Sequence, residues 1–271
     1  MVNDAKRSDL KTRTLSVLLA LPLFLFLLLY NHLTLFSLFI ILSFLSIQEF
    51  NRMVFHGSSR DFIPVVLSLW AVALFYIPRM VRSESFPLFW WYIFLLAVIL
   101  WGFLHPENIL ERVGFFLFGV LYCVILPFFW VRTGLQFGQL FLLGFAMLVW
   151  MNDIFAYLIG TCIGRHKVVP RISPGKSWEG LIGGICTSGC VGMVLSPFFF
   201  HFSYLWQGLF AGCLVAAVSF FGDIFESAMK RECLLKDSGH FLPGHGGILD
   251  RFDSFFMVGP LIFFIGTRWG G

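Results

Sequence analysis

Nine long apolar runs dominate this 271-residue chain. They lie at about residues 14–30, 33–48, 62–78, 86–104, 114–131, 139–159, 178–200, 204–222 and 253–267. About 20 apolar residues suffice for a helix to cross a bilayer, and continuous rather than alternating runs exclude a strand barrel. Only 13% of the residues are charged, against about 25% in soluble domains. The sequence therefore predicts an all-α, polytopic integral membrane protein with about nine transmembrane helices and short loops.

Basic residues predict how the chain is oriented. The first run follows a basic segment typical of a secretory signal, but no small-residue cleavage site follows, so we interpret this run as a retained helix. If the N-terminus is cytoplasmic, fifteen of the nineteen Lys and Arg residues also fall on that side, where basic loops accumulate. The exceptions are Arg79, Arg82, Arg132 and Arg268. This distribution and the short loops favour the inner (plasma) membrane of a bacterium, with the polar loops 160–177 and 223–252 in the cytoplasm.

The two halves of the sequence differ in their polar content. Residues 1–140 are expected to form N-terminal transmembrane helices for packing and lipid access. Residues 141–271 are expected to form C-terminal transmembrane helices that carry the catalytic site, within one structural unit. In the first half, Glu49 and Arg52 are interpreted as an interfacial pair, with a role at a lipid entrance as the alternative. The six cysteines show no metal-binding spacing and are assigned to packing.

A column of small residues marks the run at 178–200. Every fourth residue is small, which on a helix forms a nearly straight stripe: Gly180, Gly184, Ser188, Gly192 and Ser196. Such a stripe lets another helix approach closely. The partner is either a helix of the same chain or a second copy in a homodimer.

Ten charged residues gather between positions 223 and 253. Asp223, Glu226, Lys230 and Arg231 have the spacing of one helical face, and Asp250 and Asp253 are three residues apart where the last run begins. Internal salt bridges and helix capping are the alternatives to a lined cavity, which the position at the inner membrane edge favours. Three aspartates at such a place need a counter-charge, and Mg²⁺ commonly takes one or two carboxylates together with substrate phosphates.

Two loops complete this candidate site. The segment "PGHGG" (243–247) is rich in glycine, so its backbone N–H groups are able to turn toward an anion. The segment "GRHKVVPRISPGKSWEG" (164–180) is basic, and its two prolines exclude a regular helix. It is interpreted either as a binding loop for phosphates or lipid head groups, or as an ordinary basic inner loop. Asp153, inside the sixth run, is expected to face a polar cavity. The alternative is that this end of the run reaches the membrane interface.

The segment "SAMKRECLLKDSGHFLPGHGGILDRFD" (Ser227–Asp253) resembles the signature of the phosphatidate cytidylyltransferases, also called CDP-diacylglycerol synthases. The upstream "SPGKSWEG" (Ser173–Gly180) is similar to the Ser-Pro-Lys-Lys-Thr-Trp-Glu-Gly loop of that family, and it departs from the loop at Gly175 and Ser177. The resemblance implies transfer of CMP from CTP to phosphatidic acid, with release of pyrophosphate and with one or two Mg²⁺ ions.

The resemblance also implies roles for individual residues. The expected metal ligands are Asp223, Asp250 and Asp253. The other expected catalytic residues are Lys230, Arg231, Lys236, Asp237, His245 and Arg251. The expected contacts to CTP or the head group are Ser173, Lys176, Ser177, Ser227, Gly246 and Gly247.

The expected partners are CTP, phosphatidic acid and the lipid bilayer, with no nucleic acid. The alternatives are a CTP-dependent kinase and a cytidylyltransferase of another membrane lipid. An ion-coupled transporter is disfavoured, because the sequence shows no inverted repeat and its polar residues cluster at one membrane edge.

Overall fold

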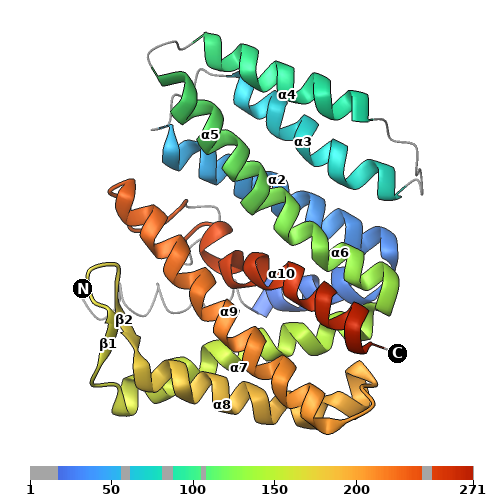
Figure 1. Ribbon diagram of the computed structural model, residues 1–271, viewed down its shortest axis with the longest axis vertical. Coiled ribbons are helices and arrows are strands. Elements are labelled where there is room, and N and C mark those ends of the chain that lie inside the picture. Colours follow the sequence, from blue (N-terminus) through green and yellow to red (C-terminus); the bar gives the residue numbers. More distant parts are fainter. Residues whose placement is uncertain (1–17, 56–61, 81–87, 105–107, 240–245, 271) are drawn as a thin grey trace. The chain divides into compact units, whose positions relative to one another are not determined.

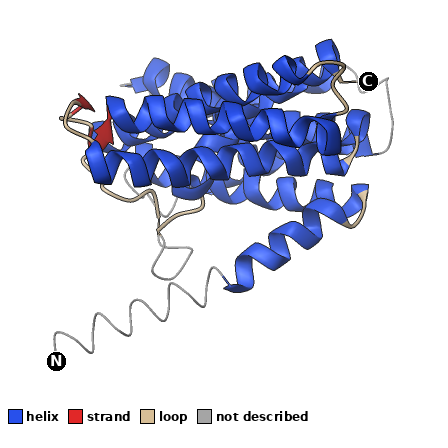
Figure 2. Cartoon of the chain, turned by 90° about the horizontal axis from the view of Figure 1, so that it is seen from below, coloured by secondary structure: helices blue, strands red, loops and turns tan. Residues whose placement is uncertain are grey.

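The computed structural model describes residues 18–55, 62–80, 88–104, 108–239 and 246–270. Helices make up most of this part of the chain, as Figures 1 and 2 show. It divides into two compact units. The first contains the described residues up to Phe128 together with those of Asp237–Asp250, and the second contains Phe129–Lys236 and the described residues from Arg251 onward. The predicted roles of residues 1–140 and 141–271 remain predictions.

The first unit is a set of packed helices. Its described elements are the helix Leu18–Leu29, α2 (His32–Val54), α3 (Phe62–Met80), α4 (Leu88–Phe103), α5 (Ile109–Val120), the π-helical turn η2 (Leu121–Ile125) and the first residues of α6 (Leu126–Phe137). Buried polar pairs join α2 to α3: the Ser43 and Tyr76 hydroxyls lie 2.8 Å apart, and the Asn51 amide donates to Ser68 at 3.1 Å. These hydrogen bonds offset part of the cost of burying polar groups in apolar surroundings.

The second unit consists of four helical elements, the rest of α6 and a hairpin. They are α7 (Gln139–Ile163), β1 (Lys167–Val169), β2 (Ser173–Ser177), α8 (Trp178–Leu195) with the π-helical turn η3 (Ser196–Phe200), α9 (Leu205–Glu232) and α10 (Leu249–Trp269), which belongs to this unit from Arg251. The strands β1 and β2 are antiparallel and are the only strands in the described residues. Prolines exclude a helix in this loop as predicted, but the sequence did not predict the strands.

The small-residue column packs α8 against α7 and α9 (Figure 1). At Gly180, an added Cβ would lie 2.7 Å from the carbonyl oxygen of Ala156 on α7. At Gly208 on α9, an added Cβ would lie 2.8 Å from the side chain of Ser196. Both distances are too short for a real side chain, so the helices approach to near backbone contact. The predicted packing role is confirmed, and it lies inside the chain, so the column gives the homodimer no support.

The described part of each predicted apolar run lies mainly on helices, but the count of nine membrane spans stays a prediction. Among the described residues, five helices are long and apolar enough to cross a membrane: His32–Val54, Ile109–Phe137, Gln139–Ile163, Trp178–Phe200 and Leu205–Glu232. Large apolar side chains are exposed along them, among them Ile182, Val194 and Phe198 on α8 and η3. A water-facing surface would not tolerate such apolar faces. The chain is therefore a helical membrane protein.

Candidate active site

Asp223 is the meeting point of two helices and the hairpin. The residue lies on α9, and one of its carboxylate oxygens accepts a hydrogen bond from the Ser254 hydroxyl on α10. The other oxygen forms an ion pair with the Lys176 ammonium from β2. That ammonium also lies 4.7 Å from the centre of the Phe220 ring, which is a favourable cation–π position. The structure thus brings together Asp223 and Lys176, which are 47 residues apart in the sequence.

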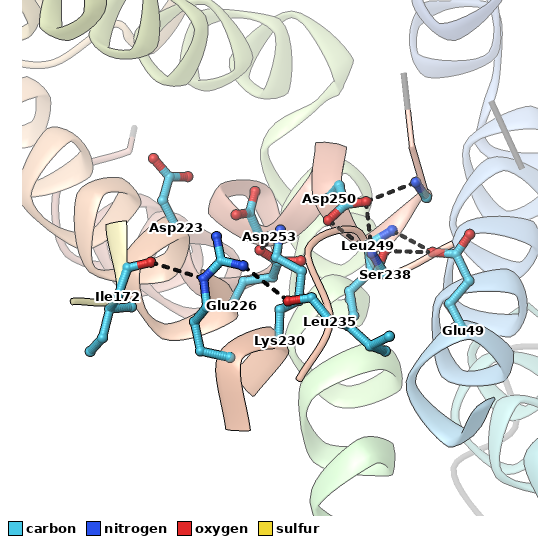
Figure 3. Close-up of polar contacts among 12 residues, drawn as sticks. Glu49, Ile172, Asp223, Glu226, Lys230, Leu235, Ser238, Leu249, Asp250 and Asp253 are labelled. Carbon is cyan, nitrogen blue, oxygen red and sulfur yellow. Dashed lines mark hydrogen bonds and ion pairs between the residues drawn. The ribbon is translucent and has the colours of Figure 1, made fainter. Parts of the chain in front are cut away.

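Asp253 adds a second carboxylate from α10 (Figure 3). It is buried, accepts a 2.8 Å hydrogen bond from the backbone N–H of Ser254, and lies close enough to Asp223 for the two charges to interact. Gly222 allows this approach, because an added Cβ there would lie 3.1 Å from the Asp253 carbonyl oxygen and from the Met257 side chain. Two neighbouring carboxylates repel one another when both are charged, and a cation beside them relieves that repulsion.

Asp153 extends this group from α7. Its carboxylate accepts hydrogen bonds from the Asn152 amide at 3.3 Å and from the Ser219 hydroxyl of α9 at 3.4 Å. Its charge also interacts with those of Asp223 and Lys176. The sequence predicted polar surroundings for this carboxylate, and the structure supplies them from α7, α9 and β2. Asp153, Asp223, Asp253, Lys176 and Ser254 are called the Asp223 cluster below.

An internal ion pair occupies the next turn of α9. The Lys230 ammonium lies 2.6 Å from the carboxylate of Glu226, whose side chain is 2% exposed. The predicted charged face of the helix is present, since α9 continues to Glu232. For this pair, the internal salt bridge that the sequence left as an alternative is confirmed.

Arg231 contacts backbone carbonyl groups. Its Nε donates to the carbonyl of Ile172 at 3.3 Å and its Nη1 to that of Leu235 at 3.1 Å (Figure 3). Arg231 thereby fixes the end of the hairpin turn against the end of α9. A guanidinium has five N–H donors, so these contacts leave others for an anion, and the predicted phosphate contact remains a prediction.

Asp250 belongs to a separate group in the first unit. Its Oδ2 accepts hydrogen bonds from the backbone N–H of Gly247 at 2.8 Å and of Ser238 at 3.0 Å. Gly246 has φ of +83°, and an added Cβ would lie 2.7 Å from the same oxygen, so the position requires glycine. The glycine-rich segment does turn a backbone N–H group toward an anion, and that anion is the Asp250 carboxylate.

Glu49 of α2 is the second carboxylate of this group. It is buried and accepts hydrogen bonds from the backbone N–H groups of Ile248 at 3.0 Å and Leu249 at 2.9 Å, and from the Ser238 hydroxyl at 3.2 Å. Donors far away in the sequence, rather than Arg52, hold this carboxylate, and its predicted position at the membrane interface stays a prediction. The available signal was a carboxylate directly after the apolar run 33–48. Glu49, Asp250 and the bonded residues 238 and 247–249 are called the Glu49 cluster below.

The other predicted residues have varied positions. Ser177 is buried and caps α8, accepting the Gly180 N–H at 3.2 Å. Ser173 begins β2, and Ser227 lies partly buried on α9. Three others are exposed: Lys236, Asp237 and Arg251. His245 lies outside the described residues.

The donor chemistry of the Asp223 cluster fits a hard divalent cation. In the described part of the chain, no group of three or more His, Cys, Asp or Glu side chains is arranged to hold a metal ion. Asp223 and Asp253 nevertheless place two carboxylates on neighbouring helices. Mg²⁺ commonly takes one or two protein carboxylates and fills its other positions with water and substrate phosphates. The two aspartates meet that requirement.

Comparisons with known proteins agree with this chemistry. Residues 11–268 match the cytidylyltransferase family. The chain is 34% identical over 262 residues to the phosphatidate cytidylyltransferase of Staphylococcus aureus (strain COL), covering 93% of this chain and 97% of the relative. The enzyme of that name from Staphylococcus saprophyticus is 32% identical over 259 residues, with the same two coverages.

A third relative carries no activity in its name. It is the uncharacterised protein YnbB of Escherichia coli (strain K12), 32% identical over 247 residues, or 84% of this chain and 77% of the relative. All three matches extend over most of both proteins, well beyond the signature-like segment. The chain belongs to the cytidylyltransferase family, as the resemblance of residues 227–253 predicted, and is a membrane-bound nucleotidyltransferase.

Proposed function

We propose that this enzyme transfers CMP from CTP to phosphatidic acid, forming CDP-diacylglycerol and pyrophosphate. The observation that carries the proposal is the Asp223 cluster, in which two carboxylates and a lysine meet within and beside the segments that resemble the phosphatidate cytidylyltransferases. Relatives with that name match the chain along almost their whole length.

The chemistry requires little from a protein base. Phosphatidic acid is a phosphate monoester, and by analogy with the phosphate pKa of about 6 in phosphoserine it is largely dianionic at neutral pH. One of its oxygens attacks the α-phosphorus of CTP, and the bond from that phosphorus to the bridging oxygen breaks as pyrophosphate leaves. Repulsion between two polyanions opposes this step. The protein therefore contributes mainly by holding the reactants in line and neutralising their charge.

Asp223 and Asp253 are the proposed Mg²⁺ ligands. Asp250 lies three residues before Asp253 on α10 and remains a further proposed ligand. One or two bound ions would neutralise phosphate oxygens and the charge that develops on pyrophosphate. Lys176 forms an ion pair with Asp223, and we propose that it shares its charge with the triphosphate when CTP binds.

The remaining roles follow the resemblance. Neutralisation of the triphosphate or lipid phosphate is assigned to Lys230, Arg231, Lys236 and Arg251. Catalytic roles are also assigned to Asp237 and His245. Contacts that hold the substrates are assigned to Ser173, Ser227, Gly246 and Gly247. For Ser177 we propose the capping role in place of a substrate contact, because its hydroxyl accepts the Gly180 N–H.

We further propose nine spans in a bacterial inner membrane, with the N-terminus and the site in the cytoplasm. The uneven distribution of Lys and Arg supports this orientation. Phosphatidic acid would keep its acyl chains in the bilayer, and CTP would enter from the cytoplasm. A site at this membrane edge joins reactants that dissolve in different solvents.

The test uses purified protein, phosphatidic acid and CTP labelled in the cytosine ring, with and without Mg²⁺. We expect the label in lipid and one pyrophosphate per lipid formed, only when both substrates and Mg²⁺ are present. Transfer of a γ-phosphate label to lipid would instead identify a CTP-dependent kinase. Labelling of a different lipid phosphate, but not of phosphatidic acid, would identify another cytidylyltransferase. One of the similar relatives has no activity in its name, so the identity of the lipid acceptor needs this direct test.

A further inference from the structure

Glu49 caps a helix that begins 200 residues later in the sequence. The helix α10 begins at Leu249, and the N–H groups of a first helical turn have no partner within the helix. The Glu49 Oε1 accepts the N–H of Ile248, and its Oε2 accepts that of Leu249. A carboxylate at this end of a helix is also favoured by the helix dipole. The start of α10 is thus fixed by α2.

The two carboxylates of the Glu49 cluster hold the same backbone. Ser238 donates its hydroxyl to Glu49 and its N–H to Asp250. Beyond residues 240–245, Gly247 donates to Asp250, while Ile248 and Leu249 donate to Glu49. A displacement of Glu49 therefore releases Ser238 and the first residues of α10 together, and these same residues hold Asp250.

Two glycines make room for the Glu49 carboxylate. An added Cβ at Gly239 would lie 2.7 Å from Oε1, and one at Gly247 would lie 2.5 Å from Oε2. Real Cβ atoms do not come so close to a carboxylate oxygen. Because Glu49 is only 6% exposed, it has little space to retreat. The absence of side chains at positions 239 and 247 thus lets the Glu49 carboxylate lie directly against the backbone.

We propose that Glu49 is a positioning residue for nucleotidyl transfer, acting by holding Asp250 in place at the start of α10. This role rests on the proposed function, in which Asp250 serves the reaction. Replacement of Glu49 leaves buried donors without an acceptor, which is costly. It also frees the backbone beside Asp250, and a displacement of about 1 Å near a reacting centre lowers the rate about a hundredfold.

The test compares Glu49→Gln with Asn51→Ala. Asn51 is a matched control, because it lies on the same helix and is also 6% exposed, but it donates to Ser68 of α3. Two quantities are measured: amide hydrogen exchange of a peptide spanning 246–250, without substrate, and kcat for CDP-lipid formation. In Glu49→Gln, the side-chain NH₂ faces N–H donors. We therefore expect exchange about tenfold faster and a kcat about tenfold to a hundredfold lower.

The control separates positioning from general stability. Asn51→Ala should lower the melting temperature while leaving both the exchange and kcat within about twofold of wild type. Unchanged exchange in Glu49→Gln, or an equal loss of kcat in both variants, overturns the proposal. If Glu49→Gln does not fold, Gly239→Ala is the second variant, since its methyl group would displace the same carboxylate and should produce the same two effects.

The experiment distinguishes an error in the proposed function from an error in the role of Glu49. Wild-type protein that makes no CDP-lipid from CTP and phosphatidic acid overturns that function and the catalytic part of this role. Exchange at 246–250 requires no substrate, so it still decides whether Glu49 holds the start of α10.

Discussion

The Asp223 cluster and the Glu49 cluster both gather carboxylates, but they satisfy them with different donors. In the Glu49 cluster, the carboxylates accept hydrogen bonds mainly from the backbone N–H groups of residues 238 and 247–249. In the Asp223 cluster, Asp223 is bonded by the side chains of Lys176 and Ser254.

This difference indicates what each cluster is suited for. A backbone N–H cannot leave without moving the chain, so carboxylates bonded in this way fix local structure. A lysine or a hydroxyl turns away about its own torsion angles, so carboxylates bonded in that way are free to exchange their partners for a metal ion or a phosphate. We therefore expect the Asp223 cluster to carry the chemistry and the Glu49 cluster to hold the backbone around Asp250 in place.

The largest effect is expected for Asp223→Asn. The substitution keeps the shape of the side chain but removes the charge that Lys176 neutralises and that a metal ion would need. We expect kcat for CDP-lipid formation to fall about a hundredfold to a thousandfold, as when a preorganised electrostatic contact is lost. A radiolabel assay in detergent measures the effect.

Ser254→Ala is the control for this prediction. It removes one donor to Asp223 and leaves the carboxylate charged, so we expect a loss of less than about tenfold. Wild-type turnover of Asp223→Asn would show that this carboxylate does not serve the reaction, and the contrast between the two clusters would then have no functional meaning.

Asp250→Asn is expected to have the next largest effect. Asp250 belongs to the Glu49 cluster and is also a proposed metal ligand. The substitution therefore tests whether Asp250 holds the backbone, binds the metal ion, or does both. The new NH₂ group cannot accept a hydrogen bond, so the backbone N–H of Ser238 or Gly247 that faces it would lose its acceptor. We expect kcat to fall about a hundredfold and the amides of Ser238 and Gly247 to exchange faster. Lower turnover with unchanged exchange would show that Asp250 acts on the metal or the substrate alone.

Lys176→Met should have a smaller effect. Methionine still covers the Phe220 ring but leaves Asp223 without its cation. If Lys176 shares its charge with the triphosphate, the KM for CTP should rise about tenfold, the value of one hydrogen bond to a charged group. Lys167→Met is the matched control, since Lys167 lies on the same hairpin with an exposed side chain and should change KM less than twofold. If both variants raise the KM for CTP equally, the change results from the lower net charge and not from the position of Lys176.

The sequence predicted best what depends on local periodicity. The charged face of α9 and the small-residue column of α8 follow from helical spacing, and the structure has both. The prolines of residues 164–177 excluded a helix, but the pairing of Lys167 with Ser177 depends on a turn that composition does not specify.

Contacts between distant residues were harder to predict. Glu49 directly follows an apolar run and was interpreted as an interfacial pair with Arg52, because nothing nearby in the sequence identified residues 238, 248 and 249 as its partners. Arg231 illustrates a related problem: its type suits phosphates, yet folding brings it to the carbonyl of Ile172, 59 residues away.

The smallest effect is expected for Ser177→Ala, where sequence and structure assign different roles. The resemblance implied a substrate contact, but Ser177 directly precedes α8, and serine is a favoured residue at that capping position. Because the buried hydroxyl accepts the Gly180 N–H, its loss should destabilise the fold by about 1 kcal/mol, while kcat and the KM for CTP stay within about twofold. A thermal melt and the lipid assay measure both quantities. A lower kcat/KM at unchanged stability would return Ser177 to the substrate site, and the hairpin would then contribute a hydroxyl as well as Lys176.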